Sequence, residues 1–428
     1  MIRAVFTFLI WAGTAAASPL PDAVSDDDFR PINLEEARLG RLLFYDPILS
    51  GNRTVACATC HHPAFGTGDG LALGIGDGGI GLGPGRSADP ENLPEQRIPR
   101  NAPGLFNLGA HEFRVLFHDG RIAVDPNKPG GLRTPLGSDM AEGFASLLSA
   151  QTMFPVLSPD EMAGHNSEND VSKAVRQGLI TGDGGAWDIL SSRIAEIPAY
   201  ADQFIAVYDH IAEPDEIAFT DISDAIAAFM ELEWRADRSP FDSVLRGEAV
   251  LAEPAATGMG LFYGVAGCAT CHSGPFQTDH SFHAMAAPQI GPGKAAKFES
   301  HTRDDGRMRV TGNEADRAAF RTPSLRNVAL TAPYGHAGAH ADLANFIAHH
   351  ADPATGYEHA TVSLPAMDVD DFAALADPLP RTDYRIDLTR TDINALVAFL
   401  NELTDPRAKT GVLGIPESVP SGLDVPNF

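Results

Sequence analysis

The chain contains the pentapeptide Cys57-Ala58-Thr59-Cys60-His61 and repeats it as Cys268-Ala269-Thr270-Cys271-His272. The two copies hold all four cysteines of the 428 residues, so no cysteine remains for a disulfide. C-x-x-C-H is the attachment signature of c-type haem, in which both thiols bond to the haem vinyl groups and the following histidine ligates the iron. The sequence therefore predicts two covalently bound haem c groups, with His61 and His272 as iron ligands, in a protein that handles electrons.

Paired cysteines can also form a four-thiolate zinc site or two redox-active dithiols. Zinc does not require a histidine after each pair. A thioredoxin-like dithiol belongs to a βαβ unit, and the sequence around the pentapeptides does not have that pattern. Both alternatives are therefore less favoured than haem attachment.

The first residues have the pattern of an export signal. Arg3 supplies a positive charge, residues 4–13 form a short, mostly apolar run, and Ala15-Ala16-Ala17 before Ser18 fits a cleavage site. The run is too short to span a membrane, and no later stretch is apolar for long enough. We expect residues 1–17 to be a signal peptide and the mature protein to work in the periplasm without a membrane span. A buried N-terminal helix is the alternative.

Length and charge restrict the class of protein. A chain of 428 residues is much longer than one small cytochrome and suggests two haem domains with additional structure. The formal net charge of −26 argues against nucleic acid as a partner. A small electron carrier with a basic patch would be steered towards such a surface, although the charge can equally serve solubility.

Helical patterns alternate with long connections rich in glycine and proline. Asn33 is placed to cap a helix over residues 34–45, with Glu36 positioned to reach back to the cap. Further helices are predicted over residues 171–180, 187–208 with a break near Pro198, 221–235 and 391–403. Residues 66–85 are too rich in glycine for regular structure, and form either a loop that approaches a cofactor or a flexible surface loop. We predict a mainly α protein with long irregular loops.

The two halves of the chain have the same organisation. Each has a helix, a C-x-x-C-H pentapeptide and a long segment after it, so the halves look like diverged copies of one cytochrome c unit. We place the boundary within residues 238–254, which gives an N-terminal haem domain of residues 18–245 and a C-terminal haem domain of residues 246–428. The C-terminal tail is a candidate to pack back on the first domain.

The surroundings of each haem decide its role. A haem whose only ligand is the proximal histidine keeps an open position that can bind peroxide, whereas a haem with a second strong ligand can only pass electrons. Near the first motif the candidate ligands are His62, His111 and His118, of which His62 is too close to His61 to reach the opposite face. After the second motif they are Met285, Met308, His336, His340, His349 and His350.

Longer motifs surround the pentapeptides. They include Leu39-Gly40-Arg41-Leu42-Leu43-Phe44-Tyr45-Asp46, Arg100-Asn101-Ala102-Pro103, Asp119-Gly120-Arg121, Phe320-Arg321-Thr322-Pro323-Ser324-Leu325-Arg326-Asn327-Val328 and Thr331-Ala332-Pro333-Tyr334-Gly335-His336. Over most of the mature chain, the sequence resembles the bacterial di-haem cytochrome c peroxidases, a superfamily that includes the di-haem enzyme maturing methylamine dehydrogenase. The resemblance implies two cytochrome c-like domains, a peroxidatic haem in the first, an electron-transfer haem in the second and a calcium ion between them.

Several site residues follow from the resemblance. Glu161 matches the glutamate that acts as acid and base on bound peroxide, and Gln151 and Pro155 match residues that line the same pocket. Without the family, Glu161 could equally be a solvated carboxylate. The matches to the family's calcium ligands are the side chain of Asn101 and the backbone carbonyls of Thr331 and Pro333.

Three positions depart from the family pattern. Asp77 stands near the place of a distal histidine in the glycine-rich loop, so we expect the first haem to be five-coordinate or water-bound without reductive activation. His118 replaces the family's inter-haem tryptophan, and we expect it to be a poorer or a proton-coupled bridge. His350 stands at the family's distal methionine or tyrosine, which predicts His272/His350 ligation and a lower potential than a methionine ligand gives. His349 is the less favoured ligand, and the alternative is that both histidines lie on the surface at a helix end.

These features predict a periplasmic di-haem peroxidase that reduces hydrogen peroxide to water with electrons from a small redox protein, a cytochrome c or a cupredoxin. The alternative enzyme would use peroxide to oxidise a protein or an organic substrate. A di-haem electron carrier without catalysis is the third hypothesis. The sequence leaves open the electron donor, the haem potentials, the role of residues 358–390 and whether the protein is a monomer or a homodimer.

Overall fold

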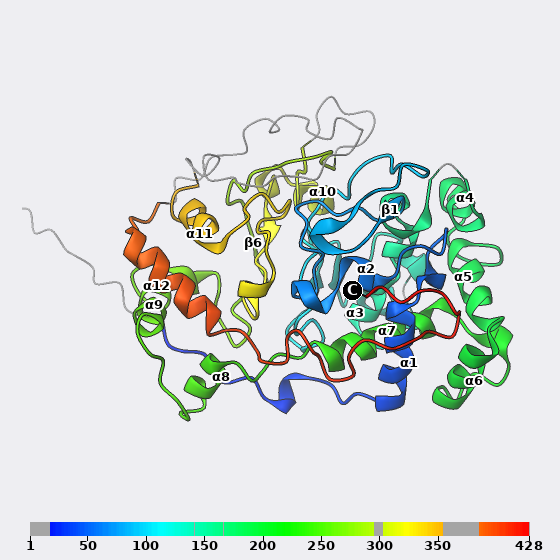
Figure 1. Ribbon diagram of the computed structural model, residues 1–428, viewed down its shortest axis with the longest axis horizontal. Coiled ribbons are helices and arrows are strands. Elements are labelled where there is room, and N and C mark those ends of the chain that lie inside the picture. The colour runs from blue at the N-terminus through cyan, green and yellow to red at the C-terminus, as the bar shows by residue number, and fades with distance from the viewer. Residues whose placement is uncertain (1–17, 141, 166, 295–302, 354–384, 428) are drawn as a thin grey trace, which may run out of the picture.

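The computed structural model describes residues 18–427 except 141, 166, 295–302 and 354–384. The predicted signal peptide and most of the segment 358–390 therefore lie outside the described residues. The described part is mainly helical (Figure 1). Within it, no helix has the length and apolar character needed to cross a membrane.

The helices are joined by long connections and three small antiparallel sheets. The helices are α1 (Leu34–Tyr45), α2 (Cys57–Cys60), α3 (Leu147–Thr152), α4 (Asp170–Gln177), α5 (Ala186–Ala195), α6 (Pro198–Val207), α7 (Phe219–Glu233), α8 (Pro240–Leu245), α9 (Ala255–Phe262), α10 (Met308–Thr311), α11 (Leu343–Ala351) and α12 (Arg390–Asn401). The sheets pair β1 (Gly79–Ile80) with β2 (Ser87–Ala88), β4 (Ile122–Val124) with both β3 (Val115–Leu116) and β5 (Leu132–Arg133), and β6 (Phe282–His283) with β7 (Phe320–Arg321).

The helices predicted from the sequence are present. The side chain of Asn33 accepts a hydrogen bond from the Glu35 amide at 3.0 Å and caps α1, as predicted. Glu36 does not reach back to this cap, because its carboxylate accepts a hydrogen bond from the Tyr208 hydroxyl at 3.0 Å instead. The predicted break separates α5 from α6, and Pro198 is the first residue of α6, where a helix does not need its missing N–H.

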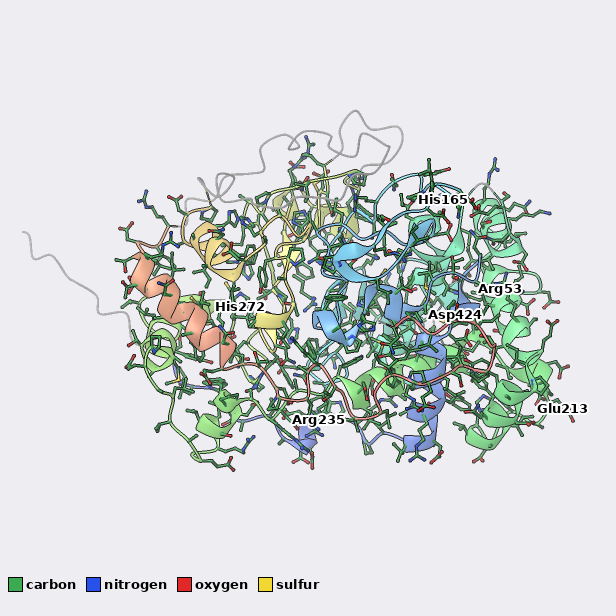
Figure 2. The ribbon with its side chains drawn as sticks, viewed as in Figure 1. Arg53, His165, Glu213, Arg235, His272 and Asp424 are labelled. Carbon is green, nitrogen blue, oxygen red and sulfur yellow. The ribbon has the colours of Figure 1, made fainter. Side chains whose placement is uncertain are left out.

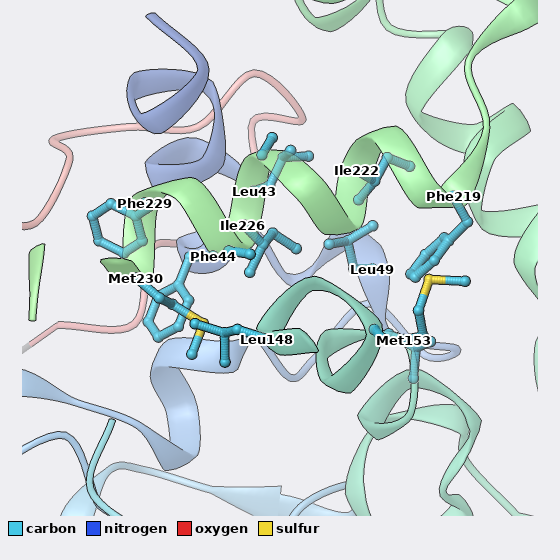
Figure 3. Close-up of a cluster of buried hydrophobic side chains, with 14 of the residues drawn as sticks. Leu43, Phe44, Leu49, Leu148, Met153, Phe219, Ile222, Ile226, Phe229 and Met230 are labelled. Carbon is cyan, nitrogen blue, oxygen red and sulfur yellow. The ribbon is translucent and has the colours of Figure 1, made fainter. Parts of the chain in front are cut away.

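Buried apolar side chains form two main clusters. The larger lies mostly in the first half, where α1, α3 and α7 meet around side chains such as Leu43 and Ile226 (Figure 3). The smaller lies in the second half, where the rings of Phe241 and Phe262 each pack 5.2 Å from that of Phe399 on α12. Phe241 belongs to α8, which ends at residue 245, the last residue of the predicted first domain; the domain boundary itself stays a prediction.

One helix pair in each half makes a close contact at a glycine. In the first half α1 packs on α7, and a Cβ atom at Gly40 would overlap the Ala225 carbonyl. In the second half α9 packs on α12, and a Cβ atom at Gly258 would overlap the Ala395 carbonyl. Each glycine lies on the helix that precedes a C-x-x-C-H pentapeptide. The halves therefore share a helix contact as well as a motif, which supports the interpretation of two related units.

The glycine-rich segment 66–85 has little regular structure, as predicted, but it is not a flexible surface loop. The buried guanidinium of Arg86 donates hydrogen bonds to the carbonyl oxygens of Ile75, Gly76 and Gly81 at 2.5–2.7 Å. A Cβ atom at Gly76 would overlap the backbone of residues 160–161, so only glycine allows the two segments to pack so closely. Arg86 and Gly76 together fix this loop against the segment that carries Glu161.

Buried ion pairs connect the two halves of the chain. Arg100 in the first half donates to both carboxylate oxygens of Asp304 in the second half, at 2.6 and 2.9 Å, and to Asp119 at 2.8 Å. All three side chains are buried. Removing one partner of such a group would leave an uncompensated buried charge, so the cluster resists separation of the halves.

The C-terminal tail runs back from α12 along the first half (red in Figure 1). The carboxylate of Glu233, at the end of α7, accepts hydrogen bonds from three successive amides of residues 412–414 at 2.6–2.8 Å. Farther along, the Ser421 hydroxyl donates to Asp46 at 2.7 Å. These contacts hold the tail against α1 and α7.

Two glycines on α9 test the helix contact of the second half. We expect Gly258→Ala to destabilise the protein by about 3 kcal/mol or more, because the added methyl meets backbone that cannot move aside. Gly260→Ala is the matched control, since nothing lies within 4 Å of its Cβ position. That change should stabilise the helix by about 0.5–1 kcal/mol. Thermal unfolding of the two variants measures both effects, and equal stability would contradict the close contact.

Candidate functional site

The two C-x-x-C-H pentapeptides form similar turns, the first a turn of α-helix, Cys57–Cys60, and the second a turn of 3-10 helix, Cys268–Thr270. In each, the histidine amide donates a hydrogen bond to the carbonyl of the first cysteine, from His61 to Cys57 and from His272 to Cys268, both at 2.9 Å. This tight turn places the two cysteines and the histidine of each pentapeptide side by side. The motifs lie in different halves of the molecule, the first on α2 (Figure 1) and the second at His272 (Figure 2).

Both histidine rings are oriented by a backbone carbonyl. The Nδ1 atom of His61 is 2.8 Å from the Thr67 oxygen, and that of His272 is 3.1 Å from the Gln277 oxygen. A carbonyl acceptor keeps the proton on Nδ1 and leaves Nε2 as the basic nitrogen for an iron. Burial lowers the pKa of both rings, which favours the neutral, ligating form. The rings are therefore suited to hold haem iron.

The zinc and dithiol alternatives fit the structure poorly. Across the described parts of the chain, the four cysteines do not gather into one metal-binding group. Burial raises the pKa of the Cys57 and Cys60 thiols to about 12. Zinc ligation and dithiol chemistry both need the thiolate, which such burial disfavours.

Glu161 lies in the pocket next to the first motif. It belongs to a turn of π-helix, Pro159–Ala163, a rare element that often occurs at functional sites. Burial raises the pKa of Glu161, and the positive charge of Arg121 partly opposes this shift. Besides burial, the charges of Asp69 and Glu161 raise the pKa of the Cys60 thiol, so the Glu161 carboxyl is close to the first haem-attachment motif. It is a half-buried carboxyl able to exchange protons, not the fully solvated one that the sequence left open.

The other two predicted pocket residues lie on the segment that leads to Glu161. Gln151 is near the end of α3, and its side-chain Oε1 atom is buried without a hydrogen-bond partner among the described residues. Buried polar atoms are nearly always paired in proteins, so this oxygen fits a site that receives a polar ligand. Pro155 begins the short 3-10 turn Pro155–Leu157, between Gln151 and Glu161.

Asp77 is buried and turned to neighbouring polar side chains. Its carboxylate accepts hydrogen bonds from the Asn52 amide at 3.1 Å and from the Thr54 hydroxyl at 3.4 Å. Its own amide donates to the Glu161 carbonyl at 3.0 Å. Asp77 therefore helps to position the Glu161 segment, and its side chain is already engaged.

His350 is the strongest candidate for the distal ligand of the second haem. It lies near the end of α11, and its Nδ1 atom is 3.1 Å from the Phe346 carbonyl oxygen, so Nε2 is the nitrogen that can face an iron. Burial, followed by the charges of His349 and His272, lowers the pKa of His350 to about 3. The influence of His272 means that the two predicted axial ligands lie close to each other.

The other candidate ligands of the second haem have different neighbours. His349 is fully buried, and its Nε2 atom is 3.1 Å from the Met285 carbonyl oxygen. His340 packs against the rings of Phe346 and His349. His336 stacks on Phe320, with ring centroids 4.0 Å apart. These contacts favour His350 over His349, and the burial of His349 is inconsistent with two surface histidines.

His118 lies where the two halves of the chain meet. Its carbonyl accepts a hydrogen bond from the Arg321 amide at 2.8 Å. Burial, followed by the charge of Arg100, lowers the pKa of His118 to about 3. The ring is therefore neutral at neutral pH. His62, which follows His61 in the sequence, is buried, and its Nδ1 accepts a hydrogen bond from the Ala64 amide at 3.2 Å.

The predicted calcium ligands come together between the halves. The Asn101 side chain donates a hydrogen bond to the Pro333 carbonyl at 2.7 Å, and the Asn101 amide donates to the His336 carbonyl at 2.8 Å. The Thr331 hydroxyl donates a hydrogen bond to the Val328 carbonyl. The backbone carbonyl of Thr331 is therefore the oxygen of this residue that could ligate calcium. An amide oxygen and two carbonyls are suitable calcium ligands, and waters would complete the coordination.

Sequence reasoning missed the residues that hold these pockets in place. Arg86 organises the glycine-rich loop, and Arg100 with Asp304 joins the halves. Arg86 follows a stretch rich in glycine and proline, whose backbone carbonyls have few partners in regular structure. An arginine at such a place indicates that its guanidinium donates hydrogen bonds to those carbonyls. The pairing of Arg100 with a residue 204 positions away has no local signal.

Comparison with known proteins connects this arrangement to one family. A family model described as di-haem cytochrome c peroxidase matches residues 34–250. The methylamine utilization protein MauG of Methylorubrum extorquens is 30% identical over 323 residues, which cover 74% of this chain and 69% of that protein. The cytochrome c551 peroxidase of Nitrosomonas europaea is 30% identical over 314 residues, which cover 73% of this chain and 72% of the relative.

A solved structure extends the likeness over both halves. The crystal structure of a MauG-like protein associated with microbial copper homeostasis superposes with a TM-score of 0.61 at 26% identity. The match covers 94% of this chain and 97% of that one.

Adjacent histidines on α11 allow a direct test of the distal ligand. We expect the oxidised wild-type protein to give a low-spin signal typical of two histidine ligands, and His350→Ala to lose it because the ring opposite His272 is removed. His349→Ala is the matched control and should keep the signal. Electron paramagnetic resonance measures both, and survival of the signal in His350→Ala would contradict the assignment.

Proposed function

This chain belongs to the di-haem cytochrome c peroxidase family, and from that premise we propose that it reduces hydrogen peroxide to water in the periplasm. Membership makes the chain a haem-containing oxidoreductase. We propose further that a small redox protein, a cytochrome c or a cupredoxin, delivers electrons to the haem held by His272. The haem held by His61 would be the site where peroxide reacts.

The observation that carries this proposal is the different surroundings of the two motifs. His350 lies close to His272, whereas Glu161 lies close to the first motif. A haem held there by His61, with an open position at its iron, would supply the site that binds peroxide and the electrons that reduce it. The protein's own residues supply the protons: Glu161 takes the proton from one peroxide oxygen and returns it to the other oxygen as it leaves.

The glycine-rich loop supports a first haem that is open in the oxidised protein. Asp77, at the position where many relatives carry a distal histidine, is hydrogen-bonded to Asn52 and Thr54. Arg86 holds the loop through three carbonyls, so the loop is not free to bring another side chain over the iron. We propose that this enzyme needs no reductive activation.

We also propose a calcium ion at Asn101, Thr331 and Pro333, which come from both halves of the chain. The neutral oxygens of this set suit calcium. Such an ion would stiffen the junction at which His118 lies. Because His118 is neutral, we infer that it is a poor bridge for electrons and does not carry a proton between the haems.

A second function has some support. The replacement of the family's distal methionine by His350 would lower the potential of the second haem. Relatives include a methylamine utilization protein and a MauG-like protein associated with copper homeostasis. An oxidase that uses peroxide to modify a protein or organic substrate is therefore the alternative. Slow turnover with reduced carriers, together with a long-lived oxidised state after peroxide addition, would favour it.

Glu161→Gln tests the acid–base role. The amide cannot take up the peroxide proton, so steady-state peroxide turnover with reduced cytochrome c should fall by about 100-fold or more. Glu36→Gln is the matched control, because burial also raises the pKa of Glu36 but the residue contacts Tyr208 instead of the haem pocket. That variant should keep wild-type turnover. Full activity of Glu161→Gln would contradict the role.

The pH dependence gives an independent test of the same residue. Glu161 must be ionised to accept a proton, and its pKa is raised, so kcat/KM should fall as the pH drops through that raised value. Arg121 lowers the pKa of Glu161. Arg121→Gln should therefore move the acidic limb of the kcat/KM profile to higher pH. A profile that stays in place, or moves to lower pH, would contradict the coupling.

The state of the first haem can be tested before any turnover. The oxidised protein as purified should show a high-spin signal from an open or water-bound haem, and should react with peroxide without prior reduction. Electron paramagnetic resonance and stopped-flow mixing with peroxide measure the two properties. A spectrum with only low-spin haem would rule out the open first haem.

A further inference from the structure

Peroxide reduction consumes protons as well as electrons. Each hydrogen peroxide takes two electrons and two protons and yields two waters, so two protons must travel from solvent to the pocket in every turnover. Glu161 can move a proton between the peroxide oxygens, but it is only half-exposed, and each turnover needs further protons delivered to it. This inference rests on the proposed peroxidase function and asks how Glu161 is connected to water.

A histidine lies between two carboxylates beside Glu161. The Nδ1 atom of His165 is 3.6 Å from a carboxylate oxygen of Glu95, and its Nε2 atom is 3.7 Å from a carboxylate oxygen of Asp160. Asp160 directly precedes Glu161 on the same π-helical turn. Burial is the main cause of the raised pKa of Glu161, and the negative charge of Asp160 raises it further. Figure 2 shows His165 near the edge of the first half.

Exposure along these residues falls from the surface inwards. The side chain of Glu95 is 53% exposed, whereas those of His165 and Asp160 are 10% and 18% exposed. The Nε2 atom of His165 is buried and has no hydrogen-bond partner among the described residues. A buried ring nitrogen that faces a carboxylate is rare unless a water or a moving proton joins the two.

Neighbouring groups hold this histidine in place. The His165 amide donates to a Glu168 carboxylate oxygen at 2.7 Å, and the same oxygen accepts from Asn52 at 2.7 Å. The Gln96 amide donates to Asp160 at 2.7 Å. The charged groups that face the histidine and its partner Asp160 are Glu95, Glu168, Asp77 and Lys294. The backbone of His165 is therefore held in place by a hydrogen bond, and each nitrogen of its ring faces a carboxylate.

We propose that Glu95, His165 and Asp160 form the path that carries protons from solvent to Glu161. Histidine is suited to this role because one ring nitrogen can accept a proton while the other releases one. Glu95 passes a solvent proton to Nδ1, Nε2 releases a proton to Asp160, and Asp160 protonates Glu161. No electrons move, and the ring returns to its starting tautomer by rotation or by exchange with water. The two distances, 3.6 and 3.7 Å, exceed direct hydrogen bonds, so a small rotation of the side chains must bring each nitrogen within hydrogen-bond reach of its carboxylate before the proton moves.

Two variants and their controls test the path through turnover. His165→Gln should lower kcat for peroxide by about 10–100-fold, at or below the lower end of the range for positioned acid–base groups. Added imidazole should restore part of the loss, because a small molecule can replace a missing proton carrier but cannot repair a misplaced backbone. His210→Gln is the control for a histidine paired with a carboxylate, Asp221, at the surface. Glu95→Gln should be milder than His165→Gln, with the exposed Glu91→Gln as its control.

A measurement without turnover completes the test. The charge of His165 lowers the pKa of Asp160, so His165→Gln should move the titration of the Asp160 carboxyl band in infrared spectra to higher pH, with Asp160→Asn identifying the band. An unchanged titration, or a kcat in His165→Gln equal to wild type while Glu161→Gln is inactive, would overturn the path and leave the peroxidase function standing. A wild-type protein that does not react with peroxide would overturn both.

Discussion

Each proximal imidazole must be neutral, with its unprotonated Nε2 atom directed at the position of the iron, and the rest of the site depends on this constraint. A backbone carbonyl meets it twice, at 2.8 Å from His61 and at 3.1 Å from His272. The carbonyls belong to residues just after each pentapeptide, so the loop behind the motif determines how the ring points. The glycine contacts of α1 with α7 and of α9 with α12 hold these motifs within two similar helical frames. Ligand orientation is thus built into the repeated unit.

The two units differ on the other side of the iron. Beside the first motif the chain places a half-buried carboxyl, Glu161, on a turn of π-helix, and fixes that turn with Gly76 and Arg86. Beside the second motif it places a helix end carrying His350. Burial has opposite effects on the charge of these groups: it favours a protonated carboxyl and a neutral imidazole. One physical effect therefore raises the pKa of the carboxyl that exchanges protons in one unit and keeps the imidazole of the proposed metal ligand neutral in the other.

The junction of the units is held together by buried charges and by the returning tail. Arg100, Asp119 and Asp304 form a buried charge cluster across it, and the tail from α12 returns to α1 and α7. His118 lies at the same junction as a neutral ring among cations. Such an arrangement keeps the distance between the motifs constant, so electron transfer would depend on that distance more than on an aromatic relay.

The sequence by itself determined the haem attachment, the main helices and their breaks, because thiol spacing, apolar periodicity and proline act within a few residues. Family resemblance then located Glu161 and His350. Only the tertiary structure decided that Glu161 lies close to the first motif, that Glu36 bonds Tyr208 instead of its helix cap, and that His165 lies between two carboxylates. Burial and long-range pairing depend on which distant segments fold together, and no local pattern encodes those distances.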